Sequence, residues 1–342
     1  MPPQEDAVEE LAPPALYLPW PEEELAEGGG EGDADDPDAA PDATPDGASG
    51  EDRTFDPELT ALLPVLRVGL VLEPSAGEFS VAEPFRAALE AGLRIPVMLI
   101  AYRDLPHLQR AIIRGAVDYA PLSASAYADA WRRCACLEPL VAPRGEDGAT
   151  GWQAVALVAA DARYRALSDL AGKRLATSGP GSTAGYRVPL AALREQGHDP
   201  ETYFAKATAH DGPVAAALAV LAGKADVAFG WRPLGGGDPP TRGTLQDVAK
   251  ERGGASGLRV VWSSAPIGNA PHTIRLGVPA AVRERIVEVL LAPPTPGEAA
   301  PLAISPQGFV PVAQADYAPV LATYPQGGDG TGRLRPLRPI SP

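Results

Sequence analysis

The chain has 342 residues, 45% of them hydrophobic and 21% charged, with a formal net charge of −15 at pH 7. This length allows two ordinary domains with a substantial core, and the lack of any run of about 18 apolar residues excludes a transmembrane helix. Residues 1–50 hold 15 Asp or Glu and no Lys or Arg, so residues 51–342 balance at 29 acidic against 29 basic. A neutral body with an acidic tail argues against nucleic-acid binding, which requires a basic surface.

Residues 1–60 are expected to form a disordered acidic tail. The stretch 28–50 contains no large apolar residue, so nothing there offsets the entropy cost of ordering the chain. Residues 7–27 place Leu16 and Trp20 between acidic clusters, and a short docking peptide is the alternative there. The basic segment and continuous apolar run of a secretory signal are both missing, so the chain as written is expected to be cytoplasmic.

From Leu66 onward, short apolar runs alternate with helical patterns. Strands are predicted at 66–72, 96–101 and 117–122, with helices over 79–92 and 105–115 between them. This alternation is typical of an α/β sheet whose parallel strands are joined by right-handed crossovers.

The same alternation continues in the second half of the chain. The predicted strands there are 152–160, 174–177, 226–230 and 258–262, and the predicted helices are 182–196, 214–222 and 280–290, with a helical turn at 167–172. Beyond 290 the chain is rich in Pro and Gly and has no regular period. No sequence repeat is visible.

The stretches 142–151 and 234–257 look like crossings between two lobes. Two crossings imply a discontinuous domain, in which the chain leaves lobe one, builds lobe two and returns. The expected division is lobe one at 66–145 and 262–320, lobe two at 151–235, a crossing with its return strand at 236–261, and a flexible C-terminal tail at 321–342.

The segment Gly179-Pro-Gly-Ser-Thr-Ala-Gly-Tyr186 follows a predicted strand and opens a predicted helix. Ser182 suits a helix N-cap, and its hydroxyl and that of Thr183 can donate to an anion near the free N–H groups and positive dipole end of the helix. The segment is not a nucleotide P-loop, because the Gly-Lys-Ser/Thr ending is missing. Local pattern alone favours the alternative, a plain capped turn.

Pro189 lies inside this predicted helix. Because proline has no N–H, the carbonyl of Gly185 is left without its helical donor, and a kink is expected there.

The run from Leu167 to Pro189, LSDLAGKRLATSGPGSTAGYRVP, closely resembles the phosphonate, phosphite and phosphate binding proteins of ABC importers. Shorter pieces match the same family in the same order over roughly residues 65–320: VDYA at 117–120, HD at 210–211 with ALAV at 217–220, KADVA at 224–228 and VWSSAPI at 261–267. Each piece is weak alone, and the ordered set is specific.

The resemblance implies a type II periplasmic-binding fold: two α/β lobes, two crossings, and a ligand held in the cleft between the lobes. It implies that Ser182, Thr183 and His210 hold the oxyanion end of the ligand, with Ala184 in place of a second serine. The rest of the expected ligand site is Gly185, Tyr186, Leu122, Ser123 and Trp152. The implied function is capture of a small oxyanion for the membrane subunits of an ABC importer, in the periplasm and without a cofactor.

Several positions depart from the family. Tyrosines of lobe one appear here as Leu105 and Leu122, and the acidic residues that hold the ammonium of aminoalkyl phosphonates fall near Pro233 and Ala270. These four side chains cannot pair with an ammonium group, so a smaller or more apolar ligand is expected, or a different class of ligand altogether. Trp152, Tyr186 and Trp231 are candidates for the cleft wall, and ordinary partly buried aromatic residues are the equal alternative.

No feature of the sequence supports catalysis or metal binding. Cys134 and Cys136 have no second Cys or His pair at ligand spacing, so they are expected to be two ordinary cysteines at a helix end, with no metal site. There is no G-x-S-x-G elbow and no conspicuous pair of carboxylates. The rival function is a cytoplasmic sensor or adaptor with a degenerate cleft. A sensing domain of a transcription regulator is disfavoured, because residues 1–60 hold no helix-turn-helix and no basic patch.

Overall fold

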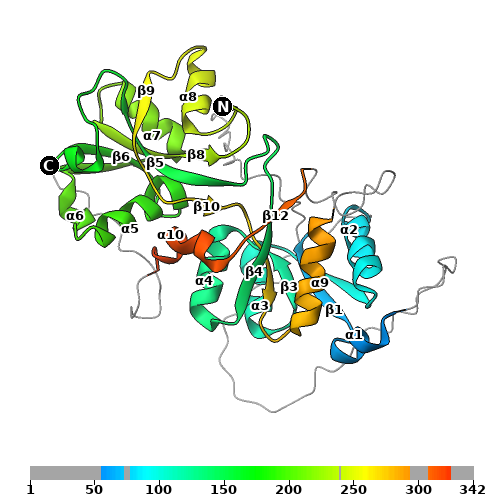
Figure 1. Cartoon of the computed structure of the whole chain (residues 1–342). Coiled ribbons are helices and arrows are strands. Elements are labelled where there is room, and N and C mark those ends of the chain that lie inside the picture. The colour runs from blue at the N-terminus through cyan, green and yellow to red at the C-terminus, as the bar shows by residue number, and fades with distance from the viewer. Residues whose placement is uncertain (1–54, 73–77, 239, 293–306, 325–342) are drawn as a thin grey trace, which may run out of the picture.

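A computed structural model describes residues 55–72, 78–238, 240–292 and 307–324. The described chain forms two lobes, each built around a six-stranded sheet (Figure 1). The first sheet has the order β12-β4-β11-β3-β1-β2, and the second has the order β10-β5-β8-β6-β7 with β9 also paired to β5. The two-lobed α/β architecture expected from the sequence is therefore confirmed.

The first lobe is built from the beginning and the end of the described chain. Its strands are β1 (Leu66–Val71), β2 (Val97–Tyr102), β3 (Tyr119–Pro121), β4 (Leu137–Pro143), β11 (His272–Arg275) and β12 (Phe309–Pro311). Its helices are α1 (Pro57–Leu62), α2 (Glu78–Leu93), α3 (Leu105–Arg114), α4 (Ala124–Cys134) and α9 (Ala280–Leu291), followed by η4 (Gln314–Tyr317) and α10 (Ala318–Leu321). Helices α2 and α9 pack together against one face of the sheet, and α3 and α4 cover the other face.

The second lobe is built from the middle of the chain. Its strands are β5 (Gly151–Ala159), β6 (Arg174–Ser178), β7 (Lys206–His210), β8 (Val227–Leu234), β9 (Leu258–Ser263) and β10 (Ile267–Gly268). Its helices are η1 (Leu167–Leu170), η2 (Thr183–Arg187), α5 (Val188–Glu195), α6 (Pro200–Tyr203), α7 (Gly212–Leu221) and α8 (Thr244–Arg252). Side chains of β5 alternate between the two faces, so Ala156 and Val158 pack toward α5 while Val155 and Leu157 pack toward α7.

Both lobes repeat one arrangement of three parallel strands, although the sequence shows no repeat. In each lobe the first strand lies between the next two, as β3-β1-β2 and as β8-β6-β7. In each lobe an arginine near the start of the central strand donates both backbone and side-chain hydrogen bonds to an aspartate. This aspartate immediately precedes the third strand. Arg67 binds Asp118 through its backbone N–H and guanidinium, and Arg174 binds Asp226 in the same way.

The chain crosses between the lobes at 144–150 and again at 269–271, where β4 gives way to β5 and β10 gives way to β11. The expected second crossing at 234–257 is wrong, because α8 lies there and packs on α7 and β8 of the second lobe. Strands β9 and β10 both pair with β5, so residues 258–268 also belong to that lobe. Gly243 and Gly253, at positive φ on either side of α8, gave this stretch its loop-like composition.

Both expected tail boundaries need correction. Asp56 caps α1 by accepting hydrogen bonds from the N–H groups of Glu58 and Leu59, so ordered structure begins before residue 60. At the other end, Tyr324 is 9% exposed. The chain is therefore packed against the protein as far as residue 324, and the expected free tail does not begin at 321. Residues 1–54 and 325–342, where the rest of both expected tails falls, lie outside the described residues.

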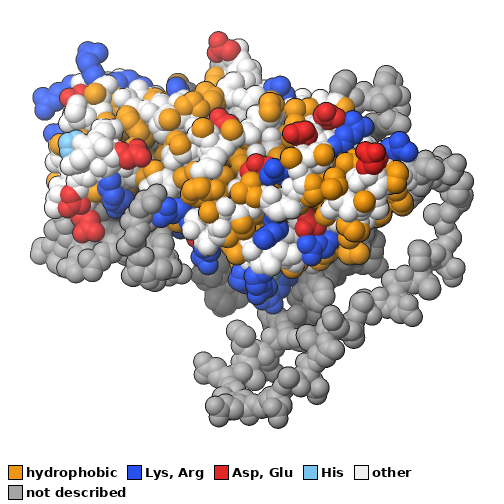
Figure 2. All heavy atoms as spheres, turned by 60° about the horizontal axis from the view of Figure 1, so that its bottom comes forward, with side chains coloured by type: hydrophobic (Ala, Val, Ile, Leu, Met, Phe, Trp, Pro, Cys, Tyr) orange, Lys and Arg blue, Asp and Glu red, His pale blue; other side chains and the backbone are white. Residues whose placement is uncertain are grey.

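The surface carries both signs of charge. Figure 2 shows Lys and Arg side chains interspersed with Asp and Glu across the face turned to the viewer, with apolar side chains between them. Among the helices that the structure describes, none has the length and apolar character needed to cross a bilayer.

Candidate functional site

The loop after β6 turns directly into a helix. Ser182 is the N-cap residue of this helix: its backbone is extended, and its Oγ accepts a hydrogen bond of 3.0 Å from the N–H of Gly185. The N–H groups of Thr183 and Ala184, at the first two helical positions, have no carbonyl one turn earlier in the helix to bind. A Cβ placed on Gly179 or Gly181 would meet nothing within 4 Å, so the loop borders open space.

The expected kink at Pro189 takes the form of a π turn. The N–H of Arg187 donates to the carbonyl of Ser182, and that of Val188 donates to the carbonyl of Thr183, both five residues back. The Thr177 hydroxyl donates to the Gly185 carbonyl at 2.6 Å and replaces the donor that Pro189 lacks. The end of β6 thereby fixes the first turn of the helix.

Ser178 lies under this turn with a free hydroxyl. The residue is 2% exposed, and its Oγ has no hydrogen-bond partner among the described residues. A Cβ on Gly185 would collide with Ser178 Oγ and would lie 3.0 Å from Ser182 Oγ, so only glycine fits between the two hydroxyls. A buried hydroxyl without a partner costs about 1–3 kcal/mol, which is the cost that a bound acceptor removes.

His210 reaches the same end of the second sheet. It is the last residue of β7 and lies opposite Ser178 in the parallel register of β6 and β7. Its half-buried imidazole makes no hydrogen bond or ion pair with the described residues. Asp211 occupies the N-cap position of α7, but its side chain makes no capping hydrogen bond. The structure thus brings Ser178, Ser182, Thr183 and His210 to one edge.

The first lobe contributes a second helix start. Ser123 caps α4 by accepting a hydrogen bond of 3.1 Å from the N–H of Ala126, and its Oγ lies 3.2 Å from that of Ser125. The preceding residue, Leu122, directly follows β3 and is 1% exposed.

One apolar cluster spans both lobes and joins three of the expected site residues. Leu122 is a buried member, and Trp152 and Ala184 of the second lobe pack against it. Leu105 and Trp262 pack against the same cluster. Trp262 was missed as a site residue, although it stands in the motif at 261–267 that carries the family resemblance.

Two of the three aromatic residues considered for the cleft wall make contacts within the second lobe. Tyr186 is 3% exposed in the core cluster of that lobe, which favours the alternative of an ordinary buried aromatic residue. The guanidinium of Arg242 lies 5.9 Å from the centre of the Trp231 ring, and the backbone N–H of Trp231 donates to Thr244 Oγ1. Of the three aromatic candidates, Trp152 is the one placed against the interlobe cluster.

The two lobes are also joined by a contact that sequence reasoning did not find. The Tyr324 hydroxyl, just after α10, donates to the carbonyl of Ser125 in α4 and accepts from the guanidinium of Arg187 in η2, each at 3.1 Å. Burial raises the pKa of Tyr324, so this hydroxyl stays protonated and able to donate. No sequence signal marked it, because a lone tyrosine in a Pro- and Gly-rich stretch has no pattern.

Hydrogen bonds also join the two crossings to each other. The side-chain amide of Asn269, in the second crossing, donates to the carbonyl of Pro143, just before the first crossing, and to that of Ala149, within it. Its own carbonyl accepts from the Tyr317 hydroxyl at 2.8 Å. Asn269 therefore links the two crossings directly.

Other hollows of the surface lie away from these residues. One of about 260 Å³ is bordered by Arg163, Tyr164 and Arg174 on the second lobe, and another of about 330 Å³ is bordered by Glu138 and Arg283 on the first. Within the described residues, no group of three or more His, Cys, Asp or Glu side chains is placed to hold a metal ion.

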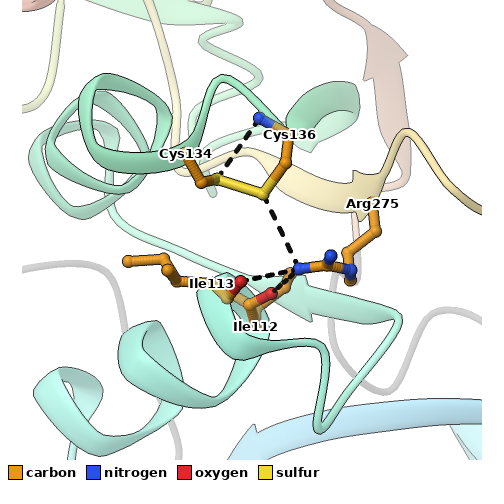
Figure 3. The surroundings of a disulfide bond; sticks show 5 residues. All are labelled: Ile112, Ile113, Cys134, Cys136 and Arg275. Atoms are coloured by element: carbon orange, nitrogen blue, oxygen red, sulfur yellow. Dashed lines mark hydrogen bonds between the residues drawn. A yellow bond between two sulfur atoms is a disulfide. The ribbon is translucent and has the colours of Figure 1, made fainter.

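Cys134 and Cys136 form a disulfide bond, which corrects the expectation of two ordinary cysteines at a helix end (Figure 3). The residues are two apart, and α4 ends at Cys134 with Ala135 in the left-handed region at φ 47°. This backbone turn brings the two side chains together. The sequence gives the spacing but not the turn, so the bond could not be read from it.

Comparison with known proteins identifies relatives for most of the described chain. Residues 75–317 match the family model described as the periplasmic substrate-binding protein of a phosphonate ABC transporter. The phosphate-import protein PhnD of Mycolicibacterium smegmatis is 30% identical over 196 residues, which is 55% of this chain and 59% of that protein. The solved structure of XAC2383 from Xanthomonas citri bound to ATP superposes with a TM-score of 0.50 at 21% identity, over 76% of this chain and 96% of that one, and supports the fold.

Proposed function

Because the chain belongs to the family of periplasmic substrate-binding proteins of phosphonate ABC transporters, we propose that it captures a small phosphonate- or phosphate-like oxyanion between its lobes. In this role it passes the anion to the membrane subunits of an importer and catalyses no reaction. The cleft closes and opens by rotation about the two crossings.

The observation that carries the proposal is the start of the helix at Thr183. The unpaired N–H groups, the helix dipole and the Thr183 hydroxyl all favour a negative charge there. Ser178 adds a buried hydroxyl without a partner, and His210 adds an imidazole at the same sheet edge. A tetrahedral oxyanion has enough acceptor oxygens to satisfy several of these donors together.

The other end of the ligand is expected to be small or apolar. The interlobe cluster presents Leu105, Leu122, Trp152 and Trp262, and none of these side chains can accept a hydrogen bond from an ammonium group. Pro233, where the family places an acidic residue, is paired with Trp152 across β8 and β5. Phosphate, phosphite and short alkyl phosphonates therefore fit this surface better than aminoalkyl phosphonates.

We place the protein outside the reducing cytosol. Its family is periplasmic, and disulfides such as Cys134–Cys136 persist mainly in oxidising compartments. Both points support this location. It can be tested by asking whether the native protein is secreted and whether it is recovered with the Cys134–Cys136 disulfide formed.

Isothermal titration of the full chain with phosphate, phosphite, methylphosphonate, 2-aminoethylphosphonate and sulfate tests the proposal. We expect one site per chain and weaker binding of the aminoalkyl compound than of methylphosphonate. Thr183→Ala should cost about 1.5–3 kcal/mol, or roughly ten- to a hundredfold in affinity, because it removes a donor to a charged acceptor.

Thr208→Ala is the matched control, since Thr208 is an exposed threonine on β7 of the same lobe. Its affinity should equal that of the wild type. No binding of any member of the panel at millimolar concentration would overturn the proposal and leave the sensor or adaptor function in its place.

A further inference from the structure

The disulfide closes a very short loop, because a single residue separates the two cysteines. Cys134 is the last residue of α4, Cys136 immediately precedes β4, and Ala135 lies between them (Figure 3). The stabilisation that a disulfide provides grows with the length of the loop it closes, so this bond contributes little of it. Ala135 adds a cost, because a residue with a Cβ is strained at φ 47°.

The turn that carries the bond is partly exposed to solvent. Cys134 and Cys136 are both half-buried, and Ala135 is exposed between them. An external thiol therefore has access to this turn of the folded protein.

A cation lies directly against one of the two sulfur atoms. The Arg275 guanidinium approaches Cys136 Sγ at 3.6 Å while donating to the carbonyls of Ile112 and Ile113 at the end of α3. Those carbonyls fix its position, and it makes no ion pair with a carboxylate of the described residues. A fixed guanidinium beside a sulfur lowers the pKa of the corresponding thiol and stabilises its thiolate.

The surroundings of Cys134 favour a thiolate less. The residue ends α4, where the helix dipole is negative, and among the described residues its sulfur accepts a hydrogen bond from the neutral backbone N–H of Cys136 at 3.2 Å. Arg133, in the same turn, is paired with Asp129. A full positive charge outweighs one neutral donor, so Cys136 is the better leaving group of the pair.

From this asymmetry we infer that Cys134–Cys136 is a site of thiol–disulfide exchange, in which an external dithiol attacks Cys134 and Cys136 leaves as a thiolate beside Arg275. The attacking thiolate forms a bond to Cys134 Sγ, the bond between Cys134 and Cys136 breaks, and its electron pair passes to Cys136 Sγ. The second thiol of the dithiol then attacks the mixed disulfide and releases Cys134. The protein gains two electrons and two protons, and the dithiol is oxidised to a disulfide.

The first test measures the rate at which dithiothreitol reduces the oxidised full chain under native conditions, by quenched alkylation and intact mass. Arg275→Met should slow reduction about three- to tenfold, because the leaving thiolate loses its cation. Arg285→Met is the matched control: Arg285 also donates to a carbonyl at a helix end, that of Gly92, but the sulfur atoms are not among its partners. Equal rates for the Arg275 and Arg285 variants would overturn the inference.

The second test needs no variant. Glutathione, a monothiol, is added to the wild type, the reaction is stopped with acid, and the adduct is located by peptide mapping. We expect glutathione on Cys134 with Cys136 free. An adduct mainly on Cys136, or a bond that reacts only after the protein is unfolded, would contradict the proposed exchange.

Discussion

At the scale of single residues, the candidate site depends on a few close contacts around Gly185. Thr177 supplies the hydrogen bond that Pro189 cannot, and Gly185 leaves room for the buried hydroxyl of Ser178. The sequence predicted correctly that the Gly185 carbonyl lacks its helical donor, because the missing N–H of proline is a local property. It did not predict Thr177 as the donor, because the contact depends on how β6 lies against the helix.

Gly185→Ala should destabilise the protein by about 1–3 kcal/mol, because the new methyl group collides with Ser178 Oγ in a packed site. Urea unfolding measures the loss. Gly181→Ala, which adds a methyl group to open space in the same loop, should leave the free energy of unfolding nearly unchanged. Equal effects of the two substitutions would show that the close packing around Gly185 is not what stabilises this turn.

A buried pair in the first lobe predicts a dependence of stability on pH. His272 is 2% exposed, and its Nδ1 is hydrogen-bonded to the Tyr119 hydroxyl at 2.5 Å. Burial lowers the pKa of His272 to about 3, whereas an unfolded histidine titrates near 6.5. The unfolded chain therefore binds a proton that the folded chain does not, and stability falls as the pH drops from about 6.5 toward 3.

His272→Gln keeps an acceptor for Tyr119 but removes the titration. Between pH 6.5 and pH 4 the variant should lose stability less steeply than the wild type, by up to about 1.4 kcal/mol per pH unit. Urea unfolding across this range measures the difference. Parallel curves for the two proteins would mean that His272 is protonated in the folded state.

At the scale of helices and strands, the segment after η4 connects the lobes. Helix α10 packs against α4 of the first lobe and α5 of the second, and Tyr324 bonds both Ser125 and Arg187. These contacts exist in the arrangement seen here, with the interlobe cluster formed. We therefore expect the Tyr324 hydroxyl to favour the closed state.

Tyr324→Phe removes both hydrogen bonds while keeping the ring. The expected loss is about 0.5–1.5 kcal/mol of closed-state stability, which appears as a roughly two- to tenfold faster dissociation of a bound oxyanion in stopped-flow measurements. Tyr164→Phe, a change of the same size on the second lobe, should leave the rate unaffected. A Tyr324 variant that releases the oxyanion at the wild-type rate would show that this contact does not stabilise the closed state.

The elements that the sequence predicted correctly have apolar runs or helical periods of their own. β1, α2, β2 and α3 each pack a regular apolar side against the core. β7 was missed because its sequence KATAH is largely exposed, and α8 was missed because glycines enclose a polar helix. These two elements owe their structure to neighbouring strands and helices more than to their own pattern.

At the scale of the whole molecule, the two lobes are one arrangement used twice and joined at a narrow hinge. The Arg67–Asp118 and Arg174–Asp226 pairs stand at equivalent places in the two sheets. Asn269 joins both crossings through its side-chain amide. The sequence predicted the two lobes and the first crossing. It could not place the second crossing, because β10 and β11 are too short to be recognised as strands.

The central claim is that an oxyanion binds at the start of the helix at Thr183, between the lobes. A crystal structure of the full chain with methylarsonate, an arsenic analogue of methylphosphonate, tests it directly, because anomalous scattering locates the arsenic atom. We expect one strong peak, placed so that the arsonate oxygens lie within hydrogen-bonding reach of the Thr183 N–H and of the hydroxyls of Thr183 and Ser178. A peak at the outer hollow beside Arg163 and Arg174, with none at Thr183, would contradict it.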